Sequence, residues 1–167
     1  MTSRTHADLQ AAINANAPLE EATYYITGSV LWPAAGALIS GRGRGKTIVK
    51  LSDGVNPQAS IGLLIHEGTG GVPAVGYYAE NVTVEHLTID GNRQNNTGVV
   101  DGLFGAGTKD FSANDVEVKN CSETGLVLSA TYAGGPYIGH AHNVGSHIFA
   151  HDNGEGIQMG AALLSDA

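Results

Sequence analysis

The chain has few charged residues, few aromatic residues and almost no cysteine. Charged residues make up 14% of its 167 residues, aromatic residues make up 6%, and Cys121 is its single cysteine. One cysteine excludes an internal disulfide, and a chain of this length can bury enough apolar surface to fold without one. No apolar run approaches the roughly 18 residues that a membrane span needs, and no signal peptide is visible at the N-terminus. We therefore expect no membrane insertion.

The charge that is present is mostly acidic. The chain has sixteen acidic and eight basic residues, which gives a formal net charge of −8. Phosphate backbones are bound by basic surfaces, so we expect no nucleic-acid partner. An acidic polysaccharide would also be repelled on average, although a local basic patch could override that repulsion.

Glycine, by contrast, is abundant, and the apolar residues follow a repeat. Residues 82–92 alternate apolar and polar side chains and end in Asp-Gly-Asn, and similar segments recur at residues 116–120 and 148–153. The spacing is 29 residues from Leu87 to Val116 and 32 residues from Val116 to Ile148. Strand and turn units that repeat every 20 to 50 residues are typical of a solenoid, and the lack of helices between them favours a parallel β-helix.

The repeat predicts an all-β fold, a short parallel β-helix of about five or six coils in a single domain spanning residues 1–167. Residues 5–16 predict a short amphipathic helix with Thr5 as its N-cap, so we assign residues 1–18 to an N-terminal cap and residues 19–167 to the coils. The alternation predicts eight inward-facing residues: Leu87, Ile89, Val116, Val118, Leu126, Leu128, Ile148 and Ala150.

Residues 41–47, Gly-Arg-Gly-Arg-Gly-Lys-Thr, invite comparison with a phosphate-binding P-loop. A P-loop needs a further glycine where this chain has Ser40, and a helix should follow, whereas residues 48–51 predict a strand. Two interpretations remain open for this segment. It is either a tight turn between coils with its cations in solvent, or a small anion-binding patch for a sugar carboxylate or sulfate, made of Arg42, Arg44 and Lys46.

Histidines and acids near the turns are the candidate metal ligands. His140, His142, His147 and His151 lie close together in the sequence, but in strands and turns they do not have the helical spacing of a zinc site. We interpret them as surface or stacked histidines. No calcium-loop motif links the acids Asp90, Asp101, Asp152 and Glu155, so we expect no cofactor and no resident metal, with Ca²⁺ as the alternative.

Several motifs resemble known β-helix families. The opening helix and residues 41–51 resemble the early coil of the pectate-lyase-like right-handed parallel β-helix superfamily, which many phage tailspikes share. Residues 82–160 resemble the catalytic modules of calcium-dependent mannuronan C5-epimerases, on the matching stretches at residues 87–93, 100–104 and 150–154. The resemblance implies a right-handed parallel β-helix and a carbohydrate-facing ancestry.

The catalytic motif of that family does not carry over to this chain. Its Tyr-Gly-x-Asp-Pro-His motif aligns with residues 124–129, where tyrosine, aspartate and histidine become Thr124, Val127 and Ser129. Its lysine becomes Val99, and Asp101 alone is kept. Each lost proton-transfer group is worth about 10²–10⁴ in rate. We therefore assign no catalytic residue and predict a vestigial groove made of Asp90, Arg93, Asp101, Tyr132 and Tyr137.

Two classes of function follow from these observations. The first is a non-catalytic structural or glycan-adhering β-helix, such as a phage-type spike, a tailspike-derived protein or a capsid decoration protein at the virion surface. The second is an extracellular enzyme that modifies an acidic polysaccharide, either a mannuronan C5-epimerase or a uronate polysaccharide lyase. Because exposed coil ends recruit further strands, we expect a homo-oligomer, with a trimer favoured. A polysaccharide and other virion proteins are the further partners we expect.

Overall fold

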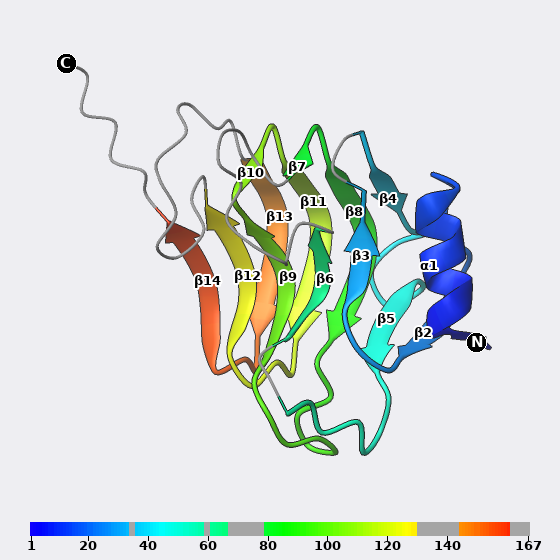
Figure 1. The fold of residues 1–167 in the computed structure, drawn as a ribbon, viewed down its shortest axis with the longest axis vertical. Coiled ribbons are helices and arrows are strands. Elements are labelled where there is room, and N and C mark those ends of the chain that lie inside the picture. Colours follow the sequence, from blue (N-terminus) through cyan, green and yellow to red (C-terminus); the bar gives the residue numbers. More distant parts are fainter. Residues whose placement is uncertain (34–35, 59–60, 67–78, 130–143, 161–167) are drawn as a thin grey trace.

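Strands from successive turns of the chain stack in parallel on their counterparts, so the fold is a parallel β-helix (Figure 1). The computed structural model describes residues 1–33, 36–58, 61–66, 79–129 and 144–160. Its strands form a seven-stranded sheet, a five-stranded sheet and a two-stranded sheet.

The bounds of the strands show how each turn of the chain contributes to the sheets. The seven-stranded sheet contains, in order, β1 (Thr2–Thr5), β2 (Ala22–Ile26), β5 (Ile48–Leu51), β8 (Thr83–Asp90), β11 (Ser112–Lys119) and β13 (Val144–His151), with β4 (Leu38–Ser40) paired to β8 beside β5. The five-stranded sheet contains β3 (Val30–Trp32), β6 (Ile61–His66), β9 (Val100–Ala106), β12 (Thr124–Ser129) and β14 (Glu155–Gly160). The small sheet pairs β7 (Ala79–Glu80) with β10 (Thr108–Lys109).

Each coil contributes one strand to each of the two large sheets. Within the described residues the pairs are β2–β3, β5–β6, β8–β9, β11–β12 and β13–β14, which makes five coils. This number confirms the expected short stack. Figure 1 shows the five-stranded sheet running side by side from β3 to β14, with α1 at the β2 end of the stack.

The core lies between the two large sheets and is built by stacking like positions. Leu87 is in register with Val116, which is in register with Ile148, and all three belong to one inward column. Ile89, Val118 and Ala150 form the next column of the same sheet, and Leu126 and Leu128 point inward from β12. The predicted core is therefore confirmed, although Ile148 and Ala150 on the outermost strand of this sheet are only half-buried.

The predicted N-terminal helix is present as α1 (His6–Asn14). Thr5 is its N-cap, as predicted, and it also forms a capping box with Asp8. Leu9 and Ile13 are buried and cover the first coil. The preceding strand β1 was not predicted: it adds to the seven-stranded sheet, so residues 1–18 supply a strand as well as a cap. No helix among the described ranges is long and apolar enough to cross a membrane.

Asparagine and glycine turns hold neighbouring coils together. Asn92 is fully buried, and its side-chain amide donates to the Leu51 carbonyl oxygen at 2.8 Å and to Asp53 Oδ1 at 2.7 Å. A Cβ at Gly91 would lie 2.5 Å from the Asn120 carbonyl oxygen, so only glycine lets the two turns approach this closely. The Asp-Gly-Asn sequence is therefore a coil-to-coil contact as well as the end of a strand.

Candidate functional site

Asp90 and Asp101, two members of the predicted groove, lie on different sheets. Asp90 ends β8, and its carboxylate accepts the Asn92 backbone N–H at 2.9 Å and the Asn120 side-chain amide at 3.0 Å. Asp90 is nearly buried, so its oxygens serve to join two turns. Arg93 is exposed, and its backbone N–H donates to the Asn120 carbonyl at 3.0 Å. Tyr132 and Tyr137 lie outside the described residues.

Asp101 sits on β9 and binds the next coil. Its Oδ1 accepts the backbone N–H of Thr124 at 3.0 Å. Burial raises the pKa of the Asp101 carboxyl, and the Thr124 hydrogen bond opposes that change. Thr124 and Val127 are both 5% exposed, while Val99 is 41% exposed. The positions at which the resemblance would place a tyrosine and an aspartate are thus filled by two nearly buried side chains without an acid or base.

The buried thiol of Cys121 lies close enough to Asp90 and Asp101 to be affected by both charges. Burial raises its pKa to about 12, and the charges of Asp101 and Asp90 act in the same direction. A thiol that stays protonated at neutral pH is a poor nucleophile. Cys121 is therefore a buried part of the core rather than a reactive thiol.

Residues 41–47, the basic loop, connect β4 to β5 across the middle of β8. Thr47 is fully buried, its hydroxyl donates to the Glu20 carbonyl at 2.8 Å, and the strand β5 follows it. These features exclude a P-loop, which would keep that hydroxyl for a metal ion and continue into a helix. Arg42 and Lys46 are exposed.

Arg44 ties the basic loop to two further coils. Its Nε lies 2.8 Å from Asp115 Oδ1 on β11, and its guanidinium carbon lies 3.9 Å from the ring centroid of Phe149 on β13. Asp115 also meets His86, with Nδ1 and Oδ2 3.0 Å apart. The bond from His86 and the charge of Arg44 lower the pKa of the Asp115 carboxyl.

A second polar cluster lies beside this one on the outer face of the seven-stranded sheet, centred on Glu117. Its carboxylate accepts the Thr88 hydroxyl at 2.7 Å and Lys119 Nζ at 3.2 Å, and it meets His151 Nε2 at 3.1 Å. Burial alone would raise the pKa of Glu117, but these three bonds outweigh it and lower that pKa. His151 also meets Asp152 at 2.8 Å, and hydrogen bonds to Asp152 and Glu117 raise the pKa of its imidazole.

The strands β8, β11 and β13, which carry both clusters, share a backbone feature that was not predicted from the sequence. His86, Asp115 and His147 occupy equivalent positions in three coils, and all have positive φ, at 55°, 53° and 52°. Left-handed backbone is uncommon outside glycine, and Asp and His tolerate it better than most residues. The signal was present in the sequence, because these residues are spaced by the same 29 and 32 residues as the core column that follows them.

The described part of the chain offers no metal centre. It contains no group of three or more histidine, cysteine, aspartate or glutamate side chains arranged to hold a metal ion. His147 and His151 both lie on β13, whereas His140 and His142 fall outside the described residues. The Ca²⁺ alternative stays untested.

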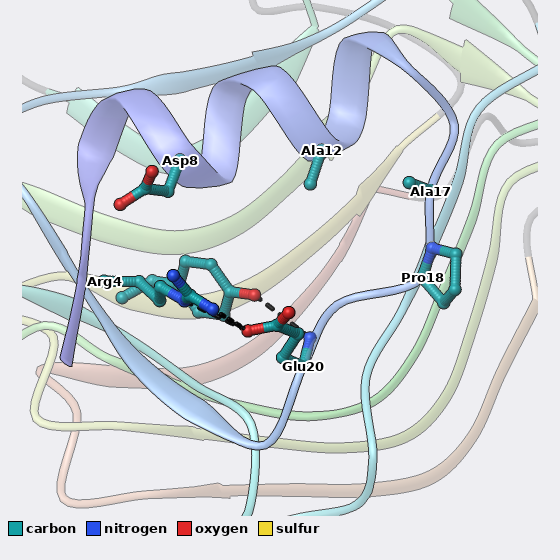
Figure 2. A pocket seen from close by; sticks show the side chains of 7 residues that line it. Arg4, Asp8, Ala12, Ala17, Pro18 and Glu20 are labelled. Carbon is teal, nitrogen blue, oxygen red and sulfur yellow. Dashed lines mark hydrogen bonds and ion pairs between the residues drawn. The ribbon is translucent and has the colours of Figure 1, made fainter. Parts of the chain in front are cut away.

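A recess lies between α1 and β2 at the capped end of the stack (Figure 2). It has a volume of about 280 Å³ and is lined by Arg4, Asp8, Ala12, Ala17, Pro18, Glu20 and Tyr24. Arg4 pairs with the Glu20 carboxylate, and the Glu20 backbone N–H donates to the Tyr24 hydroxyl at 3.0 Å. Its polar groups therefore satisfy one another and fasten the cap.

Comparison with known proteins gives this geometry a family context. The chain is 32% identical over 145 residues to the mannuronan C5-epimerase AlgE4 of Azotobacter vinelandii. This chain is homologous to part of a mannuronan C5-epimerase. The match covers 74% of this chain, which spans about a quarter (25%) of the epimerase's length. No protein-family model matches the chain.

Solved structures support the same relationship at the level of the fold. The A-module of AlgE4 superposes with a TM-score of 0.56 at 23% identity, covering 92% of this chain and 49% of the module. The A-module of AlgE6 from the same organism gives a TM-score of 0.52 at 21% identity, covering 89% of this chain and 40% of the module. The sequence match together with the shared fold confirms the epimerase resemblance, whereas the tailspike resemblance receives no support from these matches.

Proposed function

We propose that this chain binds a uronate polysaccharide and takes part in its modification as one portion of a mannuronan C5-epimerase-type protein. The observation that carries the proposal is the sequence match to a mannuronan C5-epimerase along most of this chain. The comparisons favour this reading over a phage spike or capsid decoration, which none of them supports. Because the relatives act on a polysaccharide, we place this function outside the cell.

The chemistry of the described residues favours binding over turnover. C5 epimerisation removes a proton from one face of the sugar and returns one to the other, so it needs an acid and a base. Val99, Val127 and Thr124 cannot supply these groups at neutral pH. Asp101 remains, but its carboxylate is held by the Thr124 N–H at the coil contact. We therefore assign polysaccharide recognition to this chain and no proton transfer to those positions.

The test is a binding and turnover experiment on one defined ligand. Polymannuronate oligosaccharide is titrated into the chain by calorimetry, with a neutral mannan as the control glycan. In parallel, the chain is incubated with polymannuronate in D₂O, and proton NMR follows inversion and deuterium incorporation at C5. We expect binding of polymannuronate, weaker binding of mannan and no deuterium at C5.

Two outcomes would overturn parts of the proposal. Absence of polymannuronate binding would remove the proposed function. Turnover by the wild-type chain that Asp101→Asn abolishes would show that Asp101 works with other groups as an epimerase site. The asparagine variant is suitable because its amide oxygen can still accept the Thr124 N–H, so loss of turnover would not reflect loss of this coil contact.

A further inference from the structure

We infer that the basic loop, residues 41–47, is a carboxylate-binding subsite for a polyuronate chain on the outer face of the seven-stranded sheet. This inference rests on the proposed function and adds a second place of contact to it. Asp101, by contrast, lies on the five-stranded sheet. The subsite would recognise the repeated carboxylates of the polymer through Arg42 and Lys46, next to the exposed ring of Phe149.

The loop is held in place before any ligand binds. The Gly41 N–H donates to the Glu85 carbonyl at 2.9 Å and the Gly43 N–H to the His86 carbonyl at 2.7 Å. The Gly45 N–H donates to the Thr88 hydroxyl at 2.9 Å. Three anchors in five residues fix the path of the backbone, so little ordering of the loop has to accompany binding.

Arg44 acts as the support of the loop. Its ion pair with Asp115 and its position over Phe149 connect the loop to β11 and β13. Phe149 is still 50% exposed, so an aromatic surface remains next to the loop. A pyranose ring presents C–H groups along one face, and an exposed aromatic ring offers the apolar surface that such a face can cover.

Arg42 and Lys46 are the cations available to a ligand. Both are exposed, and within the described ranges the guanidinium of Arg42 and the ammonium of Lys46 form no ion pair or hydrogen bond. Two unpaired cations separated by glycines and mounted on a fixed loop are well placed to meet successive carboxylates.

The acids nearest the loop already have donors of their own. Asp115 is engaged by Arg44 and His86, and Glu85 accepts the Ser40 hydroxyl at 2.9 Å. The Arg44 ion pair offsets part of the negative charge around the loop. Single exposed ion pairs are weak and screened by salt. A polymer with a carboxylate on every sugar can nevertheless gain affinity by making several such contacts at once.

The inference is tested with charge variants of the full chain. Arg42→Gln combined with Lys46→Gln should weaken binding of a polymannuronate oligosaccharide by about 3- to 10-fold, the loss expected for two exposed charge contacts. It should also flatten the dependence of the dissociation constant on salt. Lys46→Gln alone is compared with Lys109→Gln, which removes one positive charge from β10, outside both large sheets, and should leave the affinity unchanged.

A third variant separates stacking from charge. Phe149→Leu keeps an apolar side chain but removes the ring, so it should weaken binding while the salt dependence stays as in the wild type. Thermal melts of the Arg42 and Lys46 variants should match the wild type, because these two side chains form no ion pair or hydrogen bond within the described residues. Phe149→Leu also removes the ring beneath Arg44, so its melt shows whether the loop keeps its support.

The outcomes distinguish this inference from the proposed function. Wild-type binding that the double variant does not weaken would overturn the subsite and leave the proposed function standing. Failure of the wild-type chain to bind polymannuronate at all would overturn the proposed function itself. Tighter binding of a sulfated galactan than of polymannuronate, lost in the double variant, would keep an anion site but overturn its assignment to uronate carboxylates.

Discussion

Replacing Leu87 by alanine tests the stacking of the core most directly. Leu87 is fully buried on β8 and is in register with Val116 of the next coil. A Cβ added at Gly41 would lie only 3.0 Å from the Cβ of Leu87. The site is therefore tightly packed and has little freedom to collapse. Fully buried leucines cost about 2–5 kcal/mol when cut to alanine, as transfer and cavity terms add. We expect about 3 kcal/mol for Leu87→Ala.

The chain contains a matched control for this change. Leu38 lies on β4, which pairs with the same strand β8, but its side chain is 42% exposed. Leu38→Ala should cost less than about 1 kcal/mol, since little apolar surface leaves water there. Urea unfolding measures both free energies, and a domain of this size should lose roughly 6–12 °C in Tm for the larger change. Equal losses in the two variants would refute the inward column that contains Leu87.

Three further predictions concern the turns, the thiol and pH. Asn92→Ala should destabilise the chain by about 1–3 kcal/mol in urea unfolding, because a buried acceptor loses its donor, whereas the exposed Gln94→Ala should change stability little. Cys121, with its pKa raised to about 12, should resist a thiol reagent at neutral pH in the native chain and react once denaturant is added; fast native labelling would contradict its burial. Hydrogen bonds to Asp152 and Glu117 raise the pKa of His151, so NMR titration should place it above the usual value of about 6.5, and Asp152→Asn should lower it. The stability that this raised pKa contributes is fully present below the pKa of His151 in the unfolded chain, and it is lost as pH rises through the pKa of His151 in the folded chain. A His151 pKa that Asp152→Asn leaves unchanged would contradict the contact.

The sequence predicts the coil architecture well because alternation and repeat length are local signals. The two inward columns through Leu87 and Ile89 and the helix capped by Thr5 follow from residue patterns over short distances. Strand β1 escaped prediction because residues 2–5 are polar and show no alternation, and they become a strand only by pairing with β2. Such pairing depends on which distant segment comes to lie beside residues 2–5, and a local sequence pattern does not encode that.

The candidate site was harder to predict for a related reason. Asp90 and Asp101 are eleven residues apart in the sequence, and a corner of the coil between them sends them to different sheets. Arg44 and Phe149 are more than one hundred residues apart, yet they touch because β5, β8, β11 and β13 lie next to one another in that order. Which charged groups meet on the outer face depends on the register of three or four coils at once.

The left-handed positions explain why the basic loop emerges where it does. At His86 the β8 backbone takes a positive φ, and β4 and β5 pair with β8 on either side of that residue. β4 and β5 therefore leave a gap in the pairing opposite His86, where the backbone of β8 is kinked. Residues 41–47 leave the sheet at this gap, and the Gly43 N–H donates to the His86 carbonyl. Because Asp115 repeats the kink in the next coil, its carboxylate is placed beside the emerging loop, where Arg44 meets it. A backbone irregularity repeated from coil to coil thus positions the basic loop over the outer face, and the hydrogen bonds of Gly41, Gly43 and Gly45 hold it there before any ligand binds.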